Sequence, residues 1–281
     1  RRSSDLAGAG FVLTPEVTNG ISSDRDQQRR VLRSEAEDTT LKALRAEAAH
    51  LGIWLLIGSL GLLTEDEDGR FANRSFLVSP TGDIVARYDK IHMFDVNVSE
   101  TEQYRESSAY RPGSRAVLAQ TPFAQIGMSV CYDVRFPQLY RRLAKAGAEI
   151  LTVPAAFNDT TGAAHWESLL RARAIENGCF VLAPAQCGTH GNHNGRPRRT
   201  YGHSLAIAPW GEVMADGGTD VGVTLIDLDM SLVAKARSRV RMPSSVISWI
   251  GFALISTSST FGRLNVARYS SWKHGRLQNW R

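Results

Sequence analysis

The stretch Ile126-Gly-Met-Ser-Val-Cys-Tyr-Asp-Val-Arg-Phe-Pro137 decides how the chain is interpreted. Its first half has the pattern of a buried strand that ends on Cys131, and a polar turn then leads into a helix expected over 138–147. A strand end fixes the backbone, and a helix N-terminus offers unpaired N–H groups and the positive end of a dipole. Both features favour a thiolate, so Cys131 is a candidate nucleophile. The alternative for a lone cysteine is a buried structural residue.

Apolar runs and helical patterns alternate on both sides of this stretch. Helices are expected over 34–51, 138–147 and 165–177. Strands are expected over 11–16, 53–58, 72–79, 84–88, 116–121, 125–131, 149–154, 180–183, 204–208 and 223–228. Buried strands that alternate with amphipathic helices, with hairpins interspersed, predict an α/β layered domain with a mixed sheet or a pair of sheets.

Composition limits the class of partner. The chain has 281 residues, a net charge of +5 and three cysteines. The basic residues are spread out and show no aromatic-basic repeat, so a nucleic-acid partner is not expected, whereas small anionic substrates remain open. The sparse, odd number of cysteines favours a reducing cytoplasm. The apolar run 247–255 is too short for a bilayer, which needs about 20 residues, so no membrane partner is expected.

Two more chemically capable residues follow buried strands. Glu16 ends the first strand, and Lys90 follows the strand over 84–88. Taken singly, Glu16 is equally well a hydrogen-bonded structural group and Lys90 a surface lysine. Together with Cys131 they form a chemically sensible set: a thiolate attacks a carbonyl or nitrile carbon, a carboxylate transfers protons, and a lysine cation stabilises the oxyanion.

Several ordered motifs make the chain resemble the nitrilase (carbon–nitrogen hydrolase) superfamily over roughly residues 8–240. They are Leu13-Thr-Pro-Glu16, Tyr88-Asp-Lys-Ile-His92, Val130-Cys-Tyr-Asp-Val-Arg-Phe-Pro137, the stretch 146–188, and Tyr201-Gly-His-Ser with Pro209-Trp-Gly-Glu212. The resemblance implies a four-layer α-β-β-α sandwich, homodimers or higher homo-oligomers, and no metal or organic cofactor.

The resemblance also implies roles for single residues. Cys131 would be the nucleophile that forms a thioester, and Glu16 the general base. Lys90 and the backbone N–H of Tyr132 would form the oxyanion site. A second glutamate of the family matches Glu106 better than Glu100 or Glu102, which follow the lysine in the same loop. Alternatively, Glu106 is a solvated loop residue.

Within the superfamily, Cys-Tyr-Asp-x-Arg-Phe resembles the amidase branch that acts on deaminated glutathione and on ω-amides of 2-oxo acids. Because such substrates carry carboxylates, cations are expected in the pocket, and the candidates are Arg135, Arg171 and Arg173. Surface or interface ion pairing is the alternative for the last two. Phe157 and Thr161, expected in the loop after the strand over 149–154, are candidates for the pocket wall.

Other histidines and cysteines suggest a metal site only by their spacing. Cys187, His190 and His193 lack a fourth ligand and lie in a Gly/Asn-rich segment, so no metal is expected. His165 and His203 are expected to be hydrogen-bonded structural residues.

Both ends of the sequence depart from the family pattern. The family's first strand has no counterpart before Phe11, and residues 243–281 form an atypical tail after a domain over 1–242. Three functions therefore stand side by side: an amidase for small carboxylate-bearing amides, a nitrilase or N-carbamoyl amidohydrolase, and a truncated, catalytically silent family member.

Overall fold

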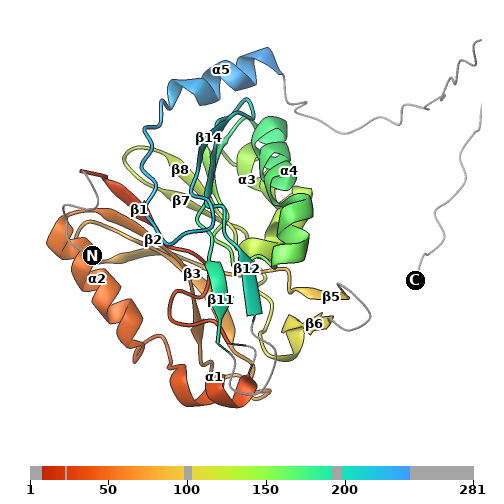
Figure 1. The fold of residues 1–281 in the computed structure, drawn as a ribbon. Helices are drawn as coiled ribbons and strands as arrows, with labels where there is room; N and C mark the ends of the chain where they lie inside the picture. Colours follow the sequence, from red (N-terminus) through yellow and green to blue (C-terminus); the bar gives the residue numbers. More distant parts are fainter. Residues whose placement is uncertain (1–7, 23, 98–102, 192–197, 241–281) are drawn as a thin grey trace, which may run out of the picture. The chain divides into compact units, whose positions relative to one another are not determined.

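A computed structural model describes residues 8–22, 24–97, 103–191 and 198–240 (Figure 1). The chain divides into two units, Arg1–Met242 and Pro243–Arg281, and every described residue belongs to the first.

The first sheet has four strands in the order β1-β2-β3-β4. Its strands are β1 (Phe11–Leu13), β2 (Trp54–Leu62), β3 (Ala72–Val78) and β4 (Ile84–Asp89). β1 runs parallel to β2, while β3 is antiparallel to both of its neighbours. The predicted hairpin of β3 and β4 is present.

The second sheet has six strands in the order β14-β13-β10-β9-β8-β7. Its strands are β7 (Val117–Gln120), β8 (Gln125–Met128), β9 (Ile150–Thr152), β10 (Phe180–Ala183), β13 (Leu205–Ile207) and β14 (Val213–Asp216). β8, β9 and β10 are parallel and buried, which explains their continuous apolar runs.

Helices cover the outer faces of the two sheets. The helices are α1 (Arg25–Val31), α2 (Thr39–Leu51), α3 (Pro137–Lys145), α4 (Asp159–Asn177) and α5 (Ser231–Arg239). Figure 1 shows α2 on the side of the first sheet and α3 and α4 on the side of the second. The predicted α-β-β-α layering is confirmed.

Alternation along β2 shows how the layers are held together. Leu56 faces the second sheet, where it joins a cluster that includes Ile126 and Met128. Its neighbours Leu55 and Ile57 join the cluster beneath α2. A fully buried side chain of this size contributes about 1.5–3 kcal/mol, so β2 stabilises both of the interfaces that it borders.

Helix caps correct two predicted boundaries. α2 begins at Thr39, after the Asp38 side chain that accepts from Leu41 N, rather than at residue 34. α4 begins at Asp159 rather than 165, because the side chain of Asn158 caps its first turn. Thr161 therefore lies in the first turn of a helix and not in a loop.

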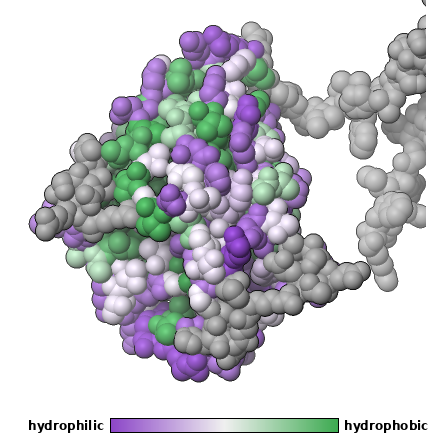
Figure 2. Space-filling view, viewed as in Figure 1, coloured by the Kyte–Doolittle hydropathy of each residue, from purple (hydrophilic) through white to green (hydrophobic). Residues whose placement is uncertain are grey.

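The prediction of a strand over 223–228 was wrong. No strand is assigned there, and β14 pairs with β13 instead. Ile226 and Leu228 still pack against the core, whereas Val221, Val223 and Leu225 are exposed. Figure 2 shows hydrophobic residues at the surface between hydrophilic ones on the face it presents. The alternating pattern is real, but among the described residues no neighbouring strand hydrogen-bonds to this segment.

Two short antiparallel strand pairs lie outside the two main sheets. β5 (Asp95–Asn97) pairs with β6 (Gln103–Arg105), and β11 (Cys187–His190) pairs with β12 (Arg198–Tyr201). Neither of these two pairings was predicted from the sequence. Among the helices that the structure describes, none combines the length and apolarity that crossing a membrane requires.

Candidate active site

Cys131 lies at the start of a 3-10 turn, Cys131–Arg135, and not at the end of a strand as predicted. β8 already ends at Met128. The backbone of Cys131 has φ +49°, and its N–H donates to Pro154 O at 2.8 Å. A non-glycine residue rarely adopts a positive φ and does so where the surroundings enforce it, often at a functional site. The cysteine is therefore held in one fixed orientation.

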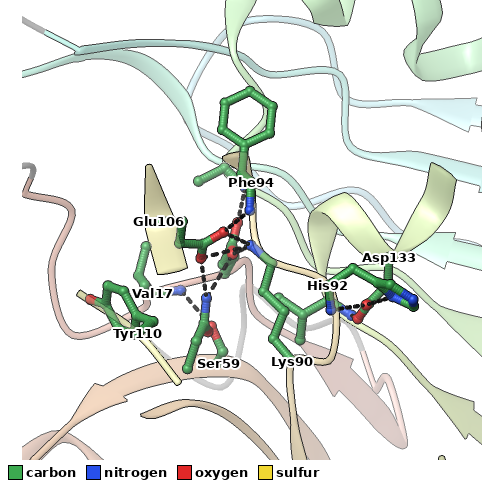
Figure 3. A network of polar contacts seen from close by, with 12 residues as sticks. Val17, Ser59, Lys90, His92, Phe94, Glu106, Tyr110 and Asp133 are labelled. Carbon is green, nitrogen blue, oxygen red and sulfur yellow. Dashed lines mark hydrogen bonds and ion pairs between the residues drawn. The ribbon is translucent and has the colours of Figure 1, made fainter. Parts of the chain in front are cut away.

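Asp133 holds this turn in place. Its buried carboxylate accepts from Val130 N at 2.9 Å and from the Tyr88 hydroxyl at 2.7 Å. It also accepts from His92 N at 3.0 Å and contacts His92 Nδ1 at 2.7 Å, as Figure 3 shows. Tyr88 and His92 flank Lys90 in the chain. One carboxylate thus joins the Cys131 turn to the segment that carries Lys90.

Glu16 follows β1 and is positioned by a close backbone approach. A Cβ at Gly58 would lie 2.0 Å from Thr14 O and 2.5 Å from Pro15 O, so only glycine lets the chain pass before Glu16. The carboxylate is buried, 4% exposed, and accepts from Ala156 N at 2.8 Å and from Asn73 Nδ2 at 2.9 Å. These bonds fix both of its oxygens.

Lys90 lies between two carboxylates. It directly follows β4, and its Nζ is 3.0 Å from Glu16 Oε1 and 2.8 Å from Glu106 Oε2. Gly113 donates from its N–H to Lys90 O, and a Cβ at Gly113 would lie 2.2 Å from Asp89 O. The lysine side chain is 2% exposed, so it is a buried cation and not a surface lysine.

Glu106 is not a solvated loop residue. It begins a 3-10 turn after β6, and its Oε2 accepts from Phe94 N at 2.6 Å as well as from Lys90. Figure 3 shows its carboxylate beside the ammonium group of Lys90. Glu100 and Glu102, the less favoured candidates, lie outside the described residues.

Burial and charge fix the protonation states of the three central groups. Burial raises the pKa of the Cys131 thiol well above its usual value, and the neighbouring Glu16 carboxylate raises it further. Burial also opposes ionisation of Glu16, but the Lys90 ammonium and the hydrogen bond with Cys131 outweigh it and lower the pKa of Glu16. Glu106 and Glu16 raise the pKa of Lys90 well above its usual value in spite of burial.

The resting site therefore contains a neutral thiol, an ionised carboxylate and an ammonium group. This corrects the expected thiolate at Cys131, because burial and the adjacent carboxylate outweigh any effect of the helix that follows. A carboxylate hydrogen-bonded to a thiol can accept its proton as the sulfur attacks an electrophile. An ammonium group beside them can stabilise a developing oxyanion.

These groups share one cavity of about 360 Å³. Six residues singled out from the sequence line it: Glu16, Lys90, Glu106, Cys131, Tyr132 and Phe157. Arg135 stacks its guanidinium over the rings of Tyr132 and Phe157, at 5.7 and 5.5 Å from their centroids, and so lies behind that wall.

Three other predicted residues lie elsewhere. Arg173 is buried, donates to Val134 O and pairs with Glu176, so it joins α4 to the Cys131 turn and does not line the cavity. Arg171 pairs with Glu167 on the helix surface. Thr161 donates its N–H to Asn158 and is also absent from the cavity wall.

Asn73, Arg25 and Arg198 are among the residues of the cavity wall that sequence reasoning missed. Asn73 contacts both glutamates, with Nδ2 at 2.9 Å from Glu16 Oε1 and 3.5 Å from Glu106 Oε1. A polar residue inside the apolar strand over 72–79 was the signal for it. Arg25 and Arg198 also line the cavity. Nothing in the sequence distinguishes them from the many other arginines.

The histidines outside the cavity have ordinary partners. His190 Nε2 contacts Thr200 Oγ1 at 2.7 Å, and His203 Nδ1 contacts Asp216 Oδ2 at 2.9 Å. His193 lies outside the described residues. No group of three or more potential metal ligands occurs within the residues that the structure describes.

Comparison with known proteins agrees with this geometry. Residues 2–238 match the carbon-nitrogen hydrolase family. A deaminated glutathione amidase from Yersinia enterocolitica is 39% identical over 236 residues, which cover 83% of this chain and 80% of that protein. The chain belongs to the carbon-nitrogen hydrolase family, and it is an amidase of the nitrilase superfamily.

Solved structures share the fold. The C. elegans NitFhit protein is 35% identical with a TM-score of 0.75, and the match covers 84% of this chain and 57% of that one. A variant of the amidase from Nesterenkonia sp. AN1 is 26% identical with a TM-score of 0.66, over 84% of this chain and 87% of that one. In that structure acrylamide has added to the active-site cysteine.

Proposed function

We propose that this amidase hydrolyses small carboxylate-bearing amides, of the class of deaminated glutathione and 2-oxo acid ω-amides, through a thioester on Cys131. The observation that carries the proposal is the meeting of Cys131, Glu16 and Lys90 in one cavity, with the Glu16 carboxylate near enough to the thiol to raise its pKa. Relatives named deaminated glutathione amidase, at about 40% identity, support the substrate class.

The first half of the reaction forms the thioester. Glu16 takes the thiol proton as Sγ of Cys131 bonds to the amide carbon, and the carbonyl electrons move onto oxygen. Lys90 and the N–H of Tyr132 stabilise that oxyanion. The tetrahedral intermediate collapses, the C–N bond breaks, and Glu16 returns the proton to the departing amine.

The second half releases the acid. Glu16 takes a proton from water as the water oxygen attacks the thioester carbon. Collapse of the second intermediate breaks the C–S bond, and the sulfur regains a proton from Glu16. No redox partner is needed, and the residues end as they began.

Glu106 and Asn73 contribute to this cycle through their contacts with Lys90 and Glu16. The Lys90 ammonium contacts both glutamates, so Glu106 offsets its charge while Glu16 is protonated during each half-reaction. Asn73 donates a hydrogen bond to one carboxylate oxygen of Glu16, and Ala156 N donates to the other. Arg135, stacked behind Tyr132 and Phe157, supports these two side chains of the cavity wall.

The test combines a substrate panel with mass spectrometry. Deaminated glutathione, 2-oxoglutaramate, an N-carbamoyl amino acid and a nitrile are supplied in turn, and the release of amine or ammonia is followed. We expect turnover of the first two and, after acid quenching, an acyl adduct on the peptide that contains Cys131. Preference for the N-carbamoyl compound or the nitrile would replace the proposed substrate class, and a folded protein that turns over none of the four would be the silent member.

Cys131→Ala should abolish turnover, because no other group at the site can form the thioester; losses on the order of a millionfold are typical for such nucleophiles. Cys187→Ala is the matched control, since that cysteine is half-buried and outside the cavity wall. Retained activity in Cys131→Ala, with an unchanged circular-dichroism spectrum, would refute the assignment of Cys131 as the nucleophile.

Assembly and location stay predictions. The family resemblance implies a homodimer or larger homo-oligomer, which light scattering on the purified chain measures directly. A cytoplasmic location, expected from the cysteine content, is tested by fractionation.

A further inference from the structure

The cavity carries more positive charge than the proposed chemistry uses. Four cations line it, Arg25, Lys90, Arg105 and Arg198, against the two carboxylates Glu16 and Glu106. Lys90 contacts both carboxylates and offsets one of their two negative charges, so the three arginines leave the cavity with a net positive charge. The remaining arginines make the cavity attractive to an anion beyond the reacting groups.

Among the three arginines that line the cavity, Arg25 has the fewest partners. It lies on α1, and no hydrogen bond or ion pair joins it to another described residue, although its Nε is buried. Three residues further along the same helix, Gln28 donates to the Tyr110 hydroxyl at 3.1 Å, and both of these residues also line the cavity. A buried guanidinium nitrogen without a partner costs free energy unless a ligand satisfies it.

Arg198 approaches the same cavity from β12. Its Nη2 donates to Ala156 O at 2.9 Å, and Ala156 N donates to Glu16. Its charge also lowers the pKa of Glu16 and acts on the pKa of Tyr110, which burial raises. Arg198 therefore lies within electrostatic reach of both the reacting carboxylate and the Gln28–Tyr110 side of the cavity.

We propose, on the basis of the function above, that Arg25 and Arg198 bind a carboxylate on the amine portion of the substrate. Guanidinium groups are suited to carboxylates because their N–H groups match the two oxygens. The acyl portion remains on Cys131 while the amine departs, so the two portions occupy different parts of the cavity. Arg135 lies behind the wall formed by Tyr132 and Phe157, whereas Arg25 and Arg198 line the cavity itself.

The size of the cavity fits a substrate with two such portions. A volume of 360 Å³ lies within the range of sites that enclose drug-sized ligands. Deaminated glutathione has a carboxylate on each side of the scissile amide, whereas 2-oxoglutaramate has one, on the acyl side. The pair Arg25 and Arg198 would thus favour the larger substrate.

The experiment compares three substrates on wild-type protein and Arg25→Gln: deaminated glutathione, the same compound with its glycine carboxylate converted to an amide, and 2-oxoglutaramate. For Arg25→Gln we expect kcat/KM to fall about ten- to hundredfold with deaminated glutathione, mainly through KM. The two substrates that lack the amine-side carboxylate should change less than about threefold. Arg25→Lys, which keeps the charge, should restore part of the preference.

Two controls separate binding from damage to the fold. Arg30→Gln alters an exposed arginine of the same helix that does not line the cavity, and should leave all three substrates unchanged. Acrylamide is a neutral amide, so its rate of addition to Cys131 should be equal in wild type and Arg25→Gln.

The outcomes are distinct. If wild type hydrolyses none of the three substrates, the proposed function fails and this inference fails with it. If wild type hydrolyses them but Arg25→Gln lowers kcat/KM equally for all three, the function stands and the inference is overturned. A selective loss with 2-oxoglutaramate would assign Arg25 to the acyl-side carboxylate and overturn the inference as well.

Discussion

At the scale of single residues, the site is a set of coupled protonation states. Cys131 holds its proton because it is buried beside an anion, and Glu16 stays ionised because Lys90 lies 3.0 Å away. Burial alone would favour the neutral forms of Glu16 and Lys90, so each of these two groups keeps its charge through its charged neighbours. The lysine thus determines which of its neighbours can act as a base.

The pH dependence of activity follows from these directions. In the proposed mechanism Glu16 acts as a base only when ionised, and its pKa is below the usual 4.5, so kcat/KM should fall only as the pH drops through that lowered value. The raised pKa of Cys131 predicts no inflection from this thiol near pH 9. The measurements are a kcat/KM profile and the pH dependence of Cys131 alkylation by iodoacetamide. An alkylation inflection between about pH 6 and 9, absent in Cys131→Ala, would contradict the assignment.

The sequence predicted the residues with a strong local context and missed the others. Glu16, Lys90 and Cys131 each sit in a short motif, and the structure brings all three together. Arg25 and Arg198 reach the cavity only through the packing of α1 and β12, which no local pattern encodes. Arg173 was expected at the cavity but does not line it, because its place on α4 directs it to Val134 and Glu176.

At the scale of elements, close backbone approaches decide where the reacting groups lie. Gly58 in β2 lets the chain before Glu16 pass, and Gly113 does the same for the segment before Lys90. A side chain at either glycine would push against backbone atoms, which cannot move as a rotamer can. Two glycines remote in sequence from Cys131 therefore help to position the groups around it.

Gly58→Ala tests this directly. Its Cβ would meet Thr14 O and Pro15 O, so we expect the free energy of unfolding to fall by about 1–3 kcal/mol and kcat to fall with the displacement of Glu16. Urea denaturation and steady-state kinetics measure the two effects. Gly10→Ala is the control, because a Cβ there meets nothing within 4 Å. Equal stability of the two variants would show that β1 shifts without cost.

Types of element were easier to predict than pairings. The long apolar runs of β2 and β9 and the helical spacing of α2 and α4 gave the right type of structure, since burial dictates both periods. The hairpins β5–β6 and β11–β12 have short, polar strands without such a period. The segment 223–228 has the period but, among the described residues, no partner strand, and pairing is a property of the neighbours and not of the segment.

At the scale of the whole domain, the reacting groups come from both sheets. Glu16 and Lys90 follow β1 and β4 of the first sheet, and Cys131 follows β8 of the second. The interface between the sheets, packed with residues such as Leu56, Ile126 and Met128, is thus also the support of the site. These groups can meet only while the two sheets keep their relative position.

Activity should therefore disappear together with the fold. In a urea titration we expect the midpoints of activity, tryptophan fluorescence and circular dichroism to coincide, because separating the sheets exposes the shared core and disperses the site at once. The three signals are recorded on the same equilibrated samples. Activity that is lost at clearly lower urea than the spectroscopic signals would show instead that the site opens locally while the sandwich persists.

The proton that burial keeps on Cys131 has a consequence for survival under oxidative stress. Peroxide reacts with thiolates and hardly at all with neutral thiols, and exposure adds to the danger. Cys131 is 7% exposed as a residue and its pKa is raised well above the usual range, so it offers peroxide very little thiolate. We therefore expect Cys131 to stay reduced at peroxide concentrations that convert low-pKa, redox-sensing cysteines to sulfenic acids.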